Sequence, residues 1–176
     1  MLLVVVLIVA GALLTWGHFY INNEVYTQLS SQKIYFPAAN SPAVAAPEFS
    51  AMKQYGGQLL TTGAQAEVYA DHFIANHLKA VAGGKTYAQL SSEAQSQPNN
   101  TTLANQVNTL FKGEALRGML LNAYAFGTIG TIMGFAAIGA YIAAAIMLVL
   151  SILGLYHSLK ANLAAVVPGT STIVAI

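Results

Sequence analysis

The feature that most constrains this chain is a long stretch without charged side chains. From Gly118 to Tyr156, 39 consecutive positions hold no Asp, Glu, Lys or Arg. As one α-helix this stretch would be about 58 Å long, nearly twice the roughly 30 Å hydrocarbon core of a bilayer. It therefore predicts a membrane helix that is longer than the membrane is thick.

Two arrangements fit this length. A hairpin of two spans would need a turn within residues 125–150, where no Pro, Asn, Asp or Ser occurs, and a turn in lipid leaves backbone groups unpaired. We favour one long apolar helix over residues 118–157, with transmembrane helix 2 at about 133–156. The more polar first half would then project outside the bilayer. The hairpin remains the alternative.

The amino terminus predicts another span. Residues 1–16 carry no charged side chain, and the apolar run continues to Ile21. Trp16, Phe19 and Tyr20 form an aromatic cluster typical of a membrane interface. A cleaved signal peptide would show a basic region and a small-x-small cleavage site, and neither occurs here. We expect a retained transmembrane helix 1 over residues 1–21.

The region between the spans, residues 22–117, predicts a mostly helical domain with no strand. The first helix should continue through Val25 and Leu29, and the prolines of residues 37–47 predict an extended, ordered loop. A helix is expected from about Thr62 to Val81, followed by a stop at Gly83 and Gly84. The fold class is thus an all-α membrane protein with two transmembrane helices enclosing a helical domain.

Two helix starts carry local signals. Thr86-Tyr-Ala-Gln89 matches a capping box, in which the Thr and Gln side chains satisfy each other's free backbone N–H groups. After a turn at "SQPNNTT", Thr101 or Thr102 is the expected N-cap of the helix that leads into the long apolar stretch.

The orientation depends on few charges. Lys160 follows the second span and favours a cytoplasmic carboxyl end, whereas Lys112 and Arg117 weigh against it from further away. We expect a multi-pass protein of the cell membrane, with residues 24–115 on the extracytoplasmic side and a tail at 158–176.

Composition excludes several chemistries. Only 7% of residues are charged, against about 25% in a soluble domain, so membrane lipids are expected contacts. A net charge of +1 gives no indication of nucleic-acid binding. With no cysteine, the chain has no disulfide, thiolate nucleophile or Cys-ligated metal.

The stretch "ADHFIANHLKAVAGGKTYAQL" looks most like a chemical site. In a helix, His72 and His77 lie about 140° apart, so they cannot clamp one metal as an i, i+4 pair could. His77 falls within an apolar stripe and is interpreted as a packed histidine. No nucleophile-elbow, zinc-protease or P-loop pattern occurs. We predict no catalytic residue, no metal and no cofactor.

Several blocks in order resemble a family of small actinobacterial two-span membrane proteins without established activity. The resemblance covers most of residues 10–155 and is carried by "QLSSQKIYFP" and "YADHFI", then by "GKTYA" and "AFG". It marks positions of unknown role at Asp71, His72, His77, Lys85, Tyr87 and Arg117. Such sequences are often labelled a small subunit of an aromatic-ring-opening dioxygenase, but the two histidines do not offer the required two-His-one-carboxylate iron site.

Small residues along the long helix predict close helix–helix contact at Gly127, Gly130, Gly134 and Gly139. The partner would be the first helix, through Ala10, Gly11 and Ala12, or a helix of another protein. Because the projecting half-helix is apolar nearly all round, it needs protein on several sides.

We therefore expect a non-catalytic accessory subunit of a larger membrane complex whose partners are other integral membrane subunits. The family's setting suggests a respiratory or membrane-oxidase assembly. A stand-alone envelope protein with a binding or sensing domain, and a membrane enzyme or metal protein, are the alternatives.

Overall fold

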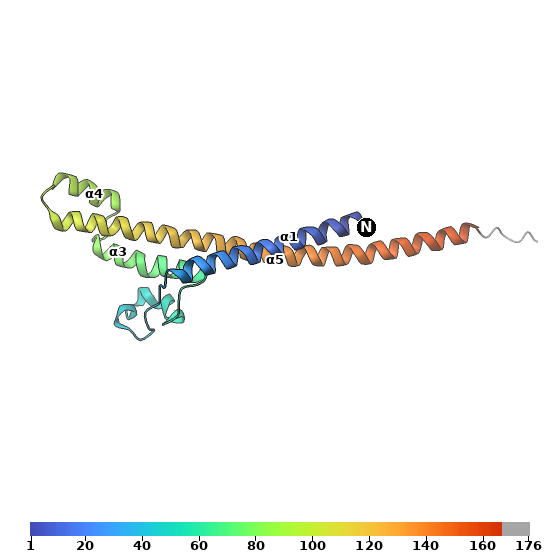
Figure 1. The fold of residues 1–176 in the computed structure, drawn as a ribbon, viewed down its shortest axis with the longest axis horizontal. Coiled ribbons are helices and arrows are strands. Elements are labelled where there is room, and N and C mark those ends of the chain that lie inside the picture. Colours follow the sequence, from blue (N-terminus) through green and yellow to red (C-terminus); the bar gives the residue numbers. More distant parts are fainter. Residues whose placement is uncertain (167–176) are drawn as a thin grey trace, which may run out of the picture. The chain divides into compact units, whose positions relative to one another are not determined.

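The computed structural model describes the backbone of residues 1–166 and the side chains of residues 1–162. The described chain is helical and contains no strand. Figure 1 shows its elements, which in order are α1 (Leu2–Ser31), η1 (Pro42–Val44), η2 (Pro47–Tyr55), α2 (Gly63–Val68), η3 (Tyr69–Ile74), α3 (Ala75–Val81), α4 (Tyr87–Ser96) and α5 (Thr101–Val166). The all-α class is thus confirmed.

The chain divides into two compact units. The paired-helix unit contains Met1–Trp16 and the chain from Met133 onward, and the central unit contains Gly17–Ile132. Both α1 and α5 contribute residues to each unit.

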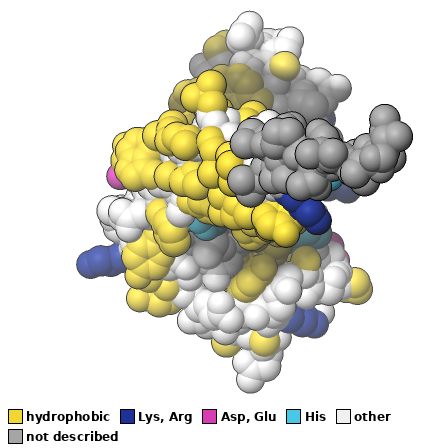
Figure 2. Space-filling model, turned by 90° about the vertical axis from the view of Figure 1, so that its right-hand side faces the viewer, with side chains coloured by type: hydrophobic (Ala, Val, Ile, Leu, Met, Phe, Trp, Pro, Cys, Tyr) yellow, Lys and Arg dark blue, Asp and Glu magenta, His cyan; other side chains and the backbone are white. Residues whose placement is uncertain are grey.

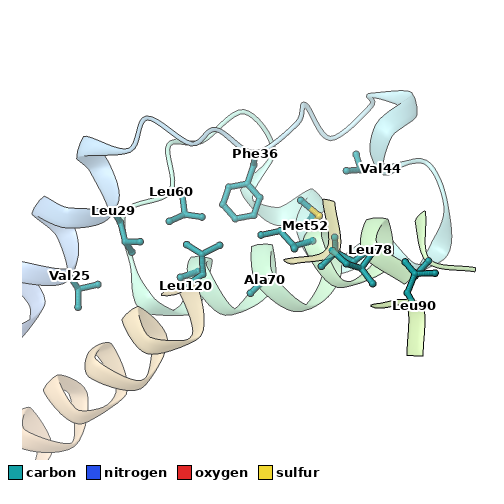
Figure 3. Close-up of a cluster of buried hydrophobic side chains, with 14 of the residues drawn as sticks. Val25, Leu29, Phe36, Val44, Met52, Leu60, Ala70, Leu78, Leu90 and Leu120 are labelled. Atoms are coloured by element: carbon teal, nitrogen blue, oxygen red, sulfur yellow. The ribbon is translucent and has the colours of Figure 1, made fainter. Parts of the chain in front are cut away.

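The central unit has a core of large apolar side chains. Phe36, Met52, Leu60 and Leu120 are almost fully buried, and Leu29 is buried beside them. Figure 3 shows these side chains pointing toward one another from α1, α5 and the segments between them. Burial of each such side chain contributes about 1.5–3 kcal/mol, so this core holds elements that are far apart in sequence.

The first helix continues beyond its apolar run, as predicted. Val25 and Leu29 lie in the core, and α1 ends at Ser31. Lys33 then adopts a positive φ of 54°, which turns the chain. Tyr35 forms an isolated antiparallel bridge with Leu59, and the Leu60 N–H donates to the Ile34 carbonyl at 2.8 Å.

The proline loop differs from its prediction. Instead of an extended segment over residues 37–47, the chain forms the short 3-10 helix η1 and enters a second one, η2. Each begins with a proline, whose fixed φ and missing N–H suit the first turn of a helix. Val44 and Met52 are buried, so tertiary packing anchors both helices.

Most predicted helix ends are confirmed. Thr62 and Thr86 each form a capping box, with Gln65 and Gln89 respectively. Gly83 and Gly84 follow α3 with φ of 59° and 82°, a conformation that favours glycine. The predicted cap at Thr101 or Thr102 was wrong by one residue, because the Asn100 side chain accepts from the Leu103 N–H at 3.0 Å.

The long-helix interpretation agrees with α5, which is continuous through residues 118–156. The helix also continues past residue 157 to Val166 and so includes part of the predicted tail. The rest of that tail, residues 167–176, lies outside the described residues.

The paired-helix unit differs from the central core in the size of the residues that it buries. Its buried residues are mostly small: Gly11 on α1, and Ala137 and Ala144 on α5. A Cβ at Gly11 would lie 2.7 Å from the Tyr141 ring, so the backbone of α1 touches this ring. Figure 2 shows hydrophobic side chains gathered over the parts of α1 and α5 nearest the viewer.

Two described helices are long and apolar enough to cross a membrane, namely α1 and the part of α5 from Thr101 to Asn162.

Candidate functional site

The motif "YADHFI" adopts a π-helix, η3, inside the helical run from Gly63 to Val81. The Ala75 N–H donates to the Ala70 carbonyl, five residues back. Such single-turn widenings of a helix are rare and often occur at functional sites. The sequence predicted the helix but gave no sign of this wider turn, which carries Asp71 and His72.

Asp71 is paired with Arg117, 46 positions away on α5. The Arg117 Nη2 and Nε groups donate to Asp71 Oδ1 at 2.8 and 3.2 Å, and Glu114 lies 3.5 Å from Arg117 Nη1. The hydrogen bond to Asp71 is the main cause that raises the pKa of Arg117. Both side chains are only partly buried, so the pair contributes on the order of 0.2–1 kcal/mol and chiefly fixes how η3 docks on α5.

His77 lies at the end of a row of aromatic rings that pack at tilted angles. Its ring centroid lies 4.3 Å from Phe73 and 5.6 Å from Phe49, and Phe73 lies 4.9 Å from Tyr69. His77 Nδ1 donates to the Phe73 carbonyl at 2.8 Å, since a carbonyl oxygen only accepts. The residue is exposed, so the predicted apolar stripe holds His77 at its edge. Burial raises the pKa of Tyr69.

The other motif positions also join elements of the central unit. His72 Nδ1 lies 3.3 Å from the Glu48 carbonyl in η2. Lys85 forms an ion pair with Glu93 of α4. The Tyr87 ring lies 6.0 Å from Phe111 of α5. Each of these positions contacts another segment of the central unit.

Two of the predicted glycines make close contacts, but with other residues than Ala10, Gly11 and Ala12. A Cβ at Gly130 would lie 3.2 Å from Ile21 and 3.1 Å from Asn22, so Gly130 packs on α1 further along than Ala10–Ala12. Gly127 instead contacts Gly63, whose Cα would lie 3.2 Å from a Gly127 Cβ.

Gly139 makes no contact within the described part of the chain. A Cβ there would meet no atom within 4 Å, because Gly139 is on the exposed side of α5, so its contact with a helix of another protein stays a prediction. Gly134 is partly buried on the same helix.

Two polar residues were missed by the sequence reasoning. His18 Nδ1 donates to the Gly130 carbonyl at 2.7 Å, directly at the glycine contact. Gln65 is buried; its Oε1 accepts from the Thr61 N–H at 2.8 Å and its Nε2 donates to Gln58 at 3.2 Å. The capping-box spacing could have indicated Gln65, but no local pattern indicates a partner 112 residues away.

The central unit therefore offers a braced helical scaffold with a partly exposed ion pair and an aromatic row. Among the residues that the structure describes, no three His, Asp or Glu side chains are grouped as metal ligands. No family model, curated protein or solved structure matches the chain. The resemblance to the actinobacterial family therefore stays a prediction.

Proposed function

We propose that the chain is a non-catalytic accessory subunit of a larger membrane protein complex. In this proposal α1 and α5 each span the cell membrane once, residues 22–117 lie on the extracytoplasmic side, and the projecting part of α5 contacts other integral membrane subunits.

The observation that carries the proposal is the mismatch between the apolar part of α5 and the bilayer. The charge-free stretch from Gly118 to Tyr156 is helical throughout and about 58 Å long. Even a helix tilted by about 40°, the upper end of the observed range, would place only about 39 Å of its length in a 30 Å core. The remainder needs protein to cover it.

Exposed side chains on α5 support one face of this helix as the contact. Phe126, Ile129 and Ile132 are spaced by three residues and are 57%, 47% and 61% exposed. We call these three residues the apolar strip. They precede the predicted span at 133–156 and lie on one side of the helix. Contiguous exposed apolar patches of this kind mark protein or membrane contacts.

The contacts of the motif residues support a structural role. Asp71 is engaged with Arg117, Lys85 with Glu93, and His77 with two aromatic rings. These side chains are used in holding helices together, which favours a scaffold over a reaction centre.

Affinity purification of the tagged chain in a mild detergent, followed by quantitative mass spectrometry, tests the proposal. We expect stoichiometric membrane proteins to co-purify with the wild type, and their recovery to fall several-fold for the Ile129→Ser, Ile132→Ser double variant. Tyr35→Ser is the control, because Tyr35 is 59% exposed in the same unit and is not part of α5.

Recovery of the chain without a stoichiometric partner would contradict the proposal and favour a stand-alone envelope protein. Equal recovery of partners with the double variant would show that the apolar strip is not the contact.

A further inference from the structure

An open groove lies between α1 and α5 within the central unit. It has a volume of about 510 Å³. On α1 it is lined by side chains on one face between Tyr20 and Gln32, and on α5 by side chains between Met119 and Phe126. Ile21 and Asn22 pack on Gly130, so the groove begins beside this helix contact, with Tyr20 and Ile21 at its end nearest the predicted first span.

The lining of the groove mixes apolar and polar side chains. On α1 the polar members Glu24, Gln28 and Gln32 all follow Tyr20 and Ile21, and apolar side chains such as Val25 and Leu29 lie among them. The polar side chains thus begin directly after the predicted span at 1–21, at the level where hydrated headgroups meet a bilayer.

The charge of the lining selects the kind of headgroup. Glu24 is the only charged residue among the lining residues, and no Lys or Arg joins it. Gln28 Nε2 donates to Glu24 Oε2 at 3.4 Å, which leaves the other carboxylate oxygen to accept from a ligand. A group with N–H donors and positive charge suits this carboxylate, whereas a net anionic headgroup would be repelled.

The volume of the groove suits part of a lipid. Grooves of about 300–1,000 Å³ take single small molecules, so a space of about 510 Å³ takes a headgroup with its glycerol unit, while the acyl chains extend beyond it.

We infer that this groove binds one membrane phospholipid with a primary-ammonium headgroup, as in phosphatidylethanolamine. The ammonium group binds Glu24, the amide N–H groups of Asn122 donate to the phosphate, and the acyl chains leave toward Tyr20 and Ile21, at the end of the predicted first span. The inference rests on the membrane location in the proposed function and not on the identity of any partner subunit.

Native mass spectrometry of the delipidated full chain in detergent tests this inference. The probes are phosphatidylethanolamine, phosphatidylcholine and phosphatidylglycerol with identical acyl chains. We expect one bound phosphatidylethanolamine, with about tenfold preference over phosphatidylcholine, since one charge-assisted hydrogen bond of about 1.5 kcal/mol gives this ratio.

Charge reversal provides the matched variants. Glu24→Gln should reduce the preference to about the phosphatidylcholine level, and Glu24→Lys should shift it to phosphatidylglycerol. Glu48→Lys, an exposed acidic position elsewhere in the central unit, should leave the preference unchanged. All variants are first shown to have wild-type helix content by circular dichroism.

Equal binding of the three lipids by the wild type, or an unchanged preference in Glu24→Lys, would overturn the inference. If partners co-purify but this preference is missing, only the lipid site fails. If the lipid preference is present and no partner co-purifies, only the subunit proposal fails.

Discussion

The two units of this chain bury opposite kinds of residue. The residues buried in the central unit include large apolar side chains: Phe36, Met52 and Leu60 are almost fully buried. In the paired-helix unit small residues such as Gly11 and Ala137 are inside, while Ile146, Val149 and Ile152 are more than half exposed.

This contrast is expected when two regions of one chain face different solvents. In water, burial of large apolar side chains drives folding. In lipid, the surroundings are as apolar as the side chains, so helices associate through close backbone approach at small residues. The packing therefore supports the proposal that the central unit lies in water and the paired-helix unit in lipid.

The largest effect is expected from the central core. Leu60→Ala should destabilise the protein by about 2–5 kcal/mol, because Leu60 is fully buried and its truncation leaves a cavity. Ile152→Ala, at an exposed position of the paired-helix unit, should change stability by no more than about 0.5 kcal/mol. Thermal unfolding in detergent, followed by circular dichroism, measures both, and equal losses would remove the contrast between the units.

A smaller effect is expected from the helix contact at Gly130. Gly130→Leu should cost on the order of 1–3 kcal/mol by overpacking against Ile21 and Asn22. Gly139→Leu is the control, because a side chain there meets open space. In the same unfolding assay, wild-type stability of Gly130→Leu would show that the two helices do not meet at this glycine.

The smallest effect concerns the histidines. His77→Ala should destabilise by about 1 kcal/mol through loss of ring contacts with Phe73 and Phe49. His72→Ala should cost less, because His72 makes one long hydrogen bond to a backbone carbonyl. Elemental analysis should find no metal lost in either variant; stoichiometric iron or zinc that disappears with one of them would indicate a metal site instead.

Features that depend on neighbouring residues could be predicted from the sequence. The capping boxes at Thr62 and Thr86 are local hydrogen-bond patterns, and the glycines after α3 are local backbone requirements. The continuous helix through residues 118–156 followed from the lack of Pro, Asn, Asp and Ser within residues 125–150.

Features set by tertiary packing could not. Asp71 and Arg117 are 46 positions apart, and Gly63 and Gly127 are 64 apart; no spacing rule connects them. The wide turn at η3 and the 3-10 helices of the proline loop likewise depend on what the rest of the unit packs against them. The predicted cap at Thr101 failed because Asn100, a stronger N-capping residue, precedes it.

The central claim is that the paired-helix unit lies in lipid while the central unit lies in water outside the cell membrane. Because the chain has no native cysteine, single cysteines can be placed at Ser96 and Ile146 and treated on intact cells with a membrane-impermeant thiol reagent. The account predicts labelling at position 96, and labelling at position 146 only after denaturation in detergent. Equal labelling of both positions on intact cells, or labelling at position 146 alone, would contradict it.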